Sequence, residues 1–134
     1  MKQDSNSRSI IAIAAGILVL SVLMGAFGAH SLEDQLSVDQ MTTFETGLTY
    51  QFYHALGLLF IGLYVKMKPS INLTWTVVFF CMGILLFSGS IYLLATKDLT
   101  GLSTRILGPI TPLGGMFLVL GWASLLWAVV RSRP

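Results

Sequence analysis

Charged side chains are scarce in this sequence: Asp, Glu, Lys and Arg make up 10% of its 134 residues, whereas 54% of the residues are hydrophobic. Soluble domains average about 25% charged residues, so this composition excludes an ordinary water-soluble domain and indicates a membrane protein. Cysteine is also scarce, because Cys81 is the only one, and an intramolecular disulfide is therefore excluded. The formal net charge of +2 is too small and too scattered to indicate a nucleic-acid partner.

Four long apolar runs account for most of the chain, and each is close to the roughly 20 residues that span the hydrocarbon core of a bilayer. The runs cover residues 10–29, 46–65, 73–95 and 110–130. They lack the polar and apolar alternation of barrel strands, so each run predicts a helix whose backbone hydrogen bonds are internal. We expect an all-α membrane protein, a four-transmembrane-helix bundle that forms a single membrane domain over residues 1–134. The predicted helices cover about 9–30, 38–66, 72–96 and 110–131.

The distribution of cations predicts how the spans are oriented. If the helices alternate in direction, three pairs of cations fall on one side: Lys2 and Arg8, Lys66 and Lys68, and Arg131 and Arg133. The other side receives only Lys97 and Arg105. By the positive-inside rule, this predicts an antiparallel bundle with both termini cytoplasmic. The first run exceeds the roughly 7 to 15 apolar residues of a signal peptide, so we expect it to remain as a span.

Two of the predicted helix starts carry capping signals. Ser37 and Gln40 match a capping box, which predicts that the second helix begins near Val38. Thr111 followed by Pro112 fits the cap and the first position of the fourth helix. The Gly-, Pro- and Thr-rich segment around this start is expected to be the longest irregular piece of the chain.

Small residues recur at helical spacing in every predicted span. Helices in lipid gain little from hydrophobic association, and small residues let two backbones approach closely. We therefore predict a tightly packed bundle rather than a wide aqueous pore. The predicted packing residues are Ser21, Gly25, Ala29, Gly47, Gly62, Gly83, Ser90, Gly114 and Gly121.

Gln51 and His54 are polar residues inside the second apolar run, and at 100° per residue they share one helix face. In a structural interpretation, they join helices through hydrogen bonds worth about 0.6 to 2 kcal/mol each. In a functional interpretation, they line a proton or substrate path, because ionisable groups within spans often mark such paths. We favour the structural interpretation, since transport sites usually contain more polar residues. Tyr50 and His30 complete this candidate intramembrane polar site.

Other combinations of polar residues give weaker predictions. Glu45 and Arg105 are expected on the same outer side and are the candidates for an ion pair between two connections. His30, Glu45 and His54 lack the i, i+3 or i, i+4 spacing that preforms a metal site, so no metal is predicted. A haem between His30 and His54 is disfavoured because the two histidines differ in predicted depth. No residue pattern supplies a nucleophile with a positioned acid and base, so we predict neither an enzyme nor a cofactor.

Four motifs occur in order along the chain and carry a resemblance to a known family. They are GAFGAH (25–30), YQFYHAL (50–56), FSGSIYLL (87–94), and TPLGG with GW (111–115 and 121–122). On these motifs the chain resembles the YgdD/YwdK-like small membrane proteins, a family classed as a domain of unknown function (DUF423). The resemblance implies a multi-pass protein of the bacterial plasma (inner) membrane with four spans. It implies no activity, because the family has no established catalytic residues to carry over.

The expected function is that of a non-enzymatic component that supports membrane integrity or a membrane partner. The bilayer is its expected environment, and the partner is a second copy of the chain or another membrane protein. One alternative is a small, proton-coupled transporter or channel that uses Gln51 and His54. A second alternative is lipid, quinone or haem binding between helices. In that case a hydrophobic slot would be walled by Phe52, Tyr53, Phe87 and Tyr92.

Overall fold

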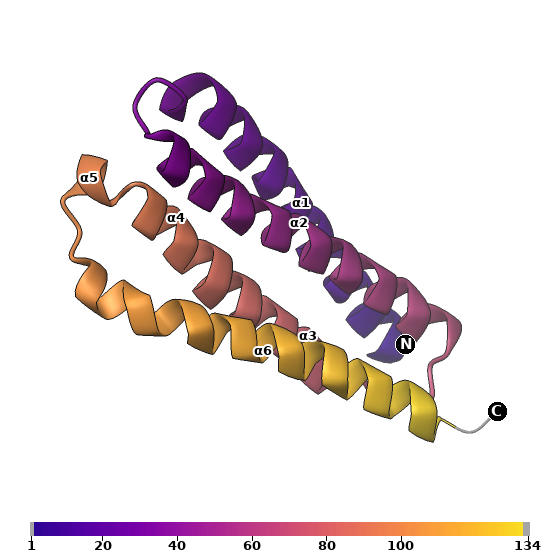
Figure 1. The fold of residues 1–134 in the computed structure, drawn as a ribbon. Coiled ribbons are helices and arrows are strands. Elements are labelled where there is room, and N and C mark those ends of the chain that lie inside the picture. Colours follow the sequence, from indigo (N-terminus) through magenta and orange to yellow (C-terminus); the bar gives the residue numbers. More distant parts are fainter. Residues whose placement is uncertain (1, 133–134) are drawn as a thin grey trace.

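The described part of the chain is built from helices. The structure is a computed structural model that describes residues 2–132, with side chains for 6–105 and 107–132 (Figure 1). The elements are α1 (Lys2–Phe27), η1 (Gly28–Leu32), α2 (Val38–Met67), α3 (Thr74–Gly83), η2 (Ile84–Ser88), α4 (Gly89–Ala95), α5 (Lys97–Thr100) and α6 (Thr104–Arg131). The elements η1 and η2 are single π-helical turns that continue the helices before them. Two cations used in the orientation prediction, Arg133 and the side chain of Lys2, lie outside the described part.

Four segments are long and apolar enough to cross a membrane, as the sequence predicts. They cover Asn6–Leu32, Val38–Met67, Thr74–Ala95 and Leu107–Arg131. Their outward surfaces are apolar, since Val22 is 66% exposed, Phe60 62% and Val130 73%. Apolar side chains are stable in the hydrocarbon core of a bilayer, so these surfaces are suited to contact with lipid tails.

The start of α2 confirms the predicted capping box. The Ser37 Oγ accepts a hydrogen bond from the Gln40 backbone nitrogen at 3.3 Å, and the Gln40 Oε1 accepts one from the Ser37 backbone nitrogen at 2.9 Å. Two of the first N–H groups of the helix are thereby satisfied, and α2 begins at Val38. The same Gln40 donates through Nε2 to the Asp98 Oδ2 at 2.7 Å, which ties the start of α2 to α5.

The start of α6 corrects the sequence analysis. The helix begins at Thr104 with Ser103 as its cap, so the predicted start near residue 110 is wrong and Pro109 and Pro112 lie inside the helix. A proline removes one helix hydrogen bond, but membrane helices tolerate this where hydroxyl side chains satisfy the freed backbone. Here Pro109 and Pro112 free the carbonyls of Arg105 and Gly108, while the Thr111 hydroxyl donates to the neighbouring Leu107 carbonyl at 3.4 Å.

The spans pack in chain order. The helix α1 lies along α2, the third span (α3, η2 and α4) contacts α2, and α6 lies along the third span (Figure 1). The main core is apolar and includes Ile10, Leu58, Ile61, Phe80 and Leu118. A second, smaller core encloses Leu32, Leu36, Phe44 and Ala95 near the α1–α2 connection. α2 and the third span are therefore the inner pair, with α1 and α6 on either side.

Charges separate to opposite ends of the molecule. At one end, called the basic end here, the first two turns of α1 carry Arg8, the end of α2 and the connection after it carry Lys66 and Lys68, and the end of α6 carries Arg131. The other end, called the acidic end, is formed by the α1–α2 connection with the start of α2 and by α5 with the start of α6; these segments carry Glu33, Asp34, Asp39 and Asp98 together with Lys97 and Arg105. The start of α1, the α2–α3 connection and the end of α6 meet at the basic end (Figure 1).

Candidate functional site

The face of α2 that carries the candidate polar residues is buried. Gln51 is 3% exposed and His54 7%. Gly47 and Gly62 extend the same face and are also buried. A Cβ on Gly47 would lie 2.9 Å from the Ile91 side chain, so the third span lies directly against this face. Both polar side chains are thus placed where helices meet rather than towards lipid.

Gln51 connects three spans through its amide group. Its Nε2 donates to the Ser21 Oγ on α1 at 2.9 Å and lies 3.4 Å from the Ile17 carbonyl. Its Oε1 accepts from the Tyr92 hydroxyl on α4 at 2.9 Å. The Ser21 hydroxyl in turn donates to the Ile17 carbonyl at 2.9 Å. The result is a continuous chain of donors and acceptors from the third span through α2 to α1.

His54 connects α2 to α6. Its two hydrogen-bond partners determine which ring nitrogen carries the proton. The ring Nδ1 lies 2.7 Å from the Tyr50 carbonyl oxygen, which can only accept, so Nδ1 carries the proton and donates. The Trp122 Nε1 is 3.1 Å from the His54 Nε2, and an indole N–H can only donate, so Nε2 accepts. One neutral tautomer satisfies both bonds, whereas a charged ring would face the Trp122 N–H with another N–H.

Aromatic rings surround His54 on several sides. Phe80 meets it edge to face with ring centroids 5.4 Å apart, and Trp122 lies tilted at 5.9 Å. Tyr50, one turn earlier on α2, stacks on the imidazole at 5.9 Å and also contacts Phe87 at 4.7 Å. Tyr50 itself remains 42% exposed. This packing encloses the imidazole and holds it in the orientation that its hydrogen bonds require.

Two pairs of hydroxyl groups join the third span to α6. The Ser90 and Thr111 oxygens are 2.7 Å apart, and the Thr76 and Ser124 oxygens are 2.8 Å apart. Ser88 is the exception in this region, since its buried hydroxyl has no hydrogen-bond partner in the structure. An unpaired buried hydroxyl opposes folding by about 1 to 3 kcal/mol.

The predicted small packing residues lie at several close approaches. An added Cβ would overlap the Leu118 side chain at Gly83, the backbone of Phe87 at Gly114 and the Phe80 ring at Gly121. At Gly62 it would lie 2.7 Å from the Ile11 side chain, and at Gly25 3.3 Å from that of Leu48. Ser21 and Ser90 act through the hydrogen bonds described above. Ala29 is exposed and borders a pocket near the acidic end.

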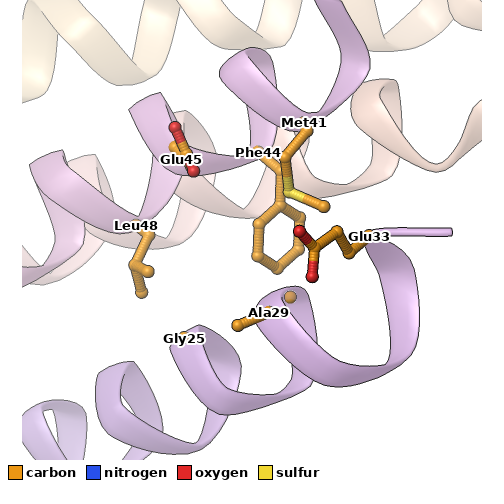
Figure 2. Close-up of a pocket in the computed structure, with 8 residues that line it drawn as sticks. Gly25, Ala29, Glu33, Met41, Phe44, Glu45 and Leu48 are labelled. Atoms are coloured by element: carbon orange, nitrogen blue, oxygen red, sulfur yellow. The ribbon is translucent and has the colours of Figure 1, made fainter. Parts of the chain in front are cut away.

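The other predicted site residues do not join this cluster. His30 lies in η1 and is exposed. Glu45 lines a pocket of about 200 Å³ between the end of the first span and α2, and Figure 2 shows it there with Glu33. Arg105 is exposed at the start of α6. Within residues 2–132 no ion pair joins Glu45 to Arg105, so the structure does not bring these two together.

An apolar groove lies between α1 and the third span and borders the polar cluster at Gln51 and Tyr92. Its volume is about 420 Å³. Its lining comes from Ile13, Ile17, Leu20, Met24, Gln51, Cys81, Ile84, Leu85, Gly89 and Tyr92. Of the four aromatic residues predicted to wall a slot, only Tyr92 lines it. Phe52 and Tyr53 are exposed on the outward side of α2.

The described side chains do not form a metal site. No group of three or more His, Cys, Asp or Glu side chains in the described part is placed to hold a metal ion. His30 and His54 are also far from sharing a site, since one is exposed at the acidic end and the other is buried among Phe80 and Trp122. The polar groups near His54 instead form hydrogen bonds with one another.

Several of the hydrogen-bond partners were not predicted from the sequence. Tyr92 and Trp122 were not expected to bond Gln51 and His54, and Thr76 was not expected to pair with Ser124. Tyrosine and tryptophan are common at membrane interfaces, so their presence in a span carries no specific signal for a buried bond. The usable signal is that a buried Tyr hydroxyl or Trp N–H usually has a partner.

The chain matches a family of membrane proteins. The family model described as "Protein of unknown function (DUF423)" matches residues 24–115, more than half of the chain. The chain belongs to this family. The DUF423 assignment confirms the resemblance carried by the four motifs, and it agrees with the four apolar helices of the structure.

Curated relatives of this DUF423 chain are also membrane proteins. The UPF0382 membrane protein of Staphylococcus epidermidis is 46% identical over 113 residues, which cover 84% of this chain and 88% of the relative. The UPF0382 inner membrane protein YgdD of Escherichia coli is 37% identical over 127 residues, which cover 95% of this chain and 93% of the relative. No solved structure matches the chain.

Proposed function

We propose that this DUF423 protein is a non-enzymatic component of the bacterial plasma membrane that supports membrane integrity or a membrane partner. In this proposal it forms an antiparallel bundle with both termini cytoplasmic. The cations of the basic end support that orientation, because the cytoplasmic side of membrane proteins is enriched in Lys and Arg. The name of the Escherichia coli relative, an inner membrane protein, supports the location.

One observation carries the functional proposal: the polar groups of Gln51 and His54 are already used between helices. Gln51 bonds Ser21 and Tyr92, and both ring nitrogens of His54 have partners. A transport path needs polar groups that face water or substrate, and a proton relay needs a ring nitrogen free to exchange its proton. Neither condition is supported by these contacts, which favours a structural role for the cluster.

The direct test is transport by the purified protein in liposomes. We expect proton and small-ion flux, followed with a dye trapped inside, to equal that of protein-free liposomes. The matched variants are His54→Ala and His30→Ala, since one removes the buried imidazole and the other an exposed one. Flux that exceeds the blank and disappears only in His54→Ala would overturn the proposal and establish the transporter alternative.

Water access to position 54 provides a second readout. In a Cys81→Ser background, His54→Cys is expected to resist a membrane-impermeant thiol reagent, whereas Ser31→Cys at the exposed acidic end is expected to react fully. Reaction of His54→Cys at a rate similar to Ser31→Cys would show an aqueous path to the cluster.

A further inference from the structure

We propose that the basic end contains a binding site for the phosphate headgroup of an anionic phospholipid. The site is a pocket of about 440 Å³ between the end of α2, the α2–α3 connection and the end of α6. Its lining residues are Lys68, Ser70, Ile71, Asn72, Trp127, Ala128, Arg131 and Ser132. It lies at the opposite end of the molecule from the pocket that Glu33 and Glu45 line (Figure 2), and it does not include Gln51 or His54.

The charge of the pocket selects an anion. Lys68 follows α2 and Arg131 ends α6, so two cations from different parts of the chain face one pocket. No carboxylate lines it, and within the part of the chain described neither cation forms an ion pair. The Arg131 guanidinium lies 4.9 Å from the centre of the Trp127 ring, which holds this cation beside the pocket. Two positive charges that line one pocket complement the negative charge of a phosphodiester.

Neutral donors are available beside the cations. The Asn72 Oδ1 accepts from the Thr74 backbone nitrogen at 3.0 Å, so the amide of Asn72 is fixed and its NH₂ group remains able to donate. Ser70 is exposed and adds a hydroxyl to the lining. Phosphate oxygens accept hydrogen bonds from groups of both kinds, in addition to the charged ones.

The position of the pocket indicates a lipid rather than a soluble anion. Trp127 is 64% exposed in the last turns of a membrane-spanning helix, where an amphipathic indole lies at headgroup level. Ile71, in the α2–α3 connection, is 7% exposed and contributes a buried apolar group to the lining of the pocket. Basic pockets between membrane helices at this depth are known to hold anionic lipid headgroups. This inference needs only a membrane-spanning chain and does not rest on the absence of transport.

Native mass spectrometry of the detergent-solubilised protein tests the site. The protein is incubated with equal amounts of phosphatidylglycerol and phosphatidylcholine of the same chain lengths, and the retained lipid is measured. We expect the wild-type protein to retain one phosphatidylglycerol in preference to phosphatidylcholine. Each cation near a lipid surface contributes about a fivefold change in affinity, so Lys68→Gln with Arg131→Gln is expected to weaken retention by about 25-fold.

Lys66→Gln is the matched control, because Lys66 is exposed at the same end but does not line the pocket. It is expected to retain lipid as the wild type does. If Lys66→Gln lost as much bound phosphatidylglycerol as the double variant, the lipid would be attracted by the overall positive charge of this end. That result would overturn the proposed site. Equal retention of the two lipids by the wild type would also overturn it, whatever the stability of the variants. Displacement of the lipid by millimolar inorganic phosphate would assign the pocket to a soluble anion instead.

Discussion

The bond between Gln51 and Tyr92 is the most direct test of how the spans are held together. Gln51→Leu replaces the amide with an apolar side chain that is one atom shorter, and it removes both the acceptor for Tyr92 and the donor for Ser21. Hydrogen bonds between membrane helices average about 0.6 kcal/mol and reach about 1.7 kcal/mol. Two such bonds give an expected loss of about 1 kcal/mol in the free energy of unfolding for Gln51→Leu, and one bond gives about 0.6 kcal/mol for Tyr92→Phe.

A double-mutant cycle separates the shared bond from other effects. If the Tyr92 hydroxyl stabilises the protein only through Gln51, the double variant loses no more than Gln51→Leu alone. The expected coupling energy is then about 0.6 kcal/mol. Unfolding in mixed micelles, followed by the helical circular dichroism signal, measures all four proteins under the same conditions.

Tyr53→Phe is the control for loss of a tyrosine hydroxyl, because Tyr53 lies on the same helix as Gln51 and is 63% exposed. It is expected to leave the unfolding free energy unchanged. The reasoning would be refuted if the losses from Gln51→Leu and Tyr92→Phe simply added, to within about 0.3 kcal/mol. Additive losses would show that each residue acts through separate contacts.

The remaining predictions concern packing and the buried polar atoms. Gly114→Ala is expected to lower the unfolding free energy by about 1 to 3 kcal/mol, because its Cβ would overlap the Phe87 backbone, and thermal unfolding measures this. At Gly16 an added Cβ has open space within 4 Å, so Gly16→Ala is expected to stabilise the helix by about 0.5 to 1 kcal/mol in the same assay. Equal losses of unfolding free energy in Gly16→Ala and Gly114→Ala would contradict the packing argument. Ser88→Ala removes an unpaired buried hydroxyl, so the free energy of unfolding, measured with a chemical denaturant, is expected to stay unchanged or to rise by up to about 1 kcal/mol. A decrease of about 1 kcal/mol would instead reveal a partner for this hydroxyl. Trp122→Phe removes the donor to the His54 Nε2, so the imidazole ¹⁵N signals are expected to shift towards a mixture of tautomers, and unchanged signals would contradict the assigned bond.

The number of spans and the start of α2 could be predicted because both depend on local patterns. Apolar length alone marks a span, and Ser37 with Gln40 forms a capping box that needs no distant contact. The start of α6 could not be read in the same way. Pro112 after Thr111 is a good local start signal, but the helix continues back to Thr104. Thr111 therefore lies within the helix, where its hydroxyl bonds the Leu107 carbonyl, instead of capping the helix end.

The hydrogen-bond partners of Gln51 and His54 could not be predicted from local sequence patterns. The shared face of Gln51 and His54 follows from helix periodicity, but Tyr92 and Trp122 come from spans whose rotation about their own axes depends on packing. The π-helical turn η2 adds to this difficulty, because an extra residue in a turn changes which side chains of the third span face α2. The orientation of the termini and the roles of the candidate site residues stay predictions.

The position of the His54 partner has a consequence for biogenesis. Spans enter the membrane in the order of synthesis, and Gln51 finds Ser21 on a span made before it. His54 must instead wait for Trp122, which belongs to the last span. A chain that stops after the third span would therefore leave the Nε2 atom of His54 without its donor. The bond between Trp122 and His54 can therefore form only after the whole of α6 has been made.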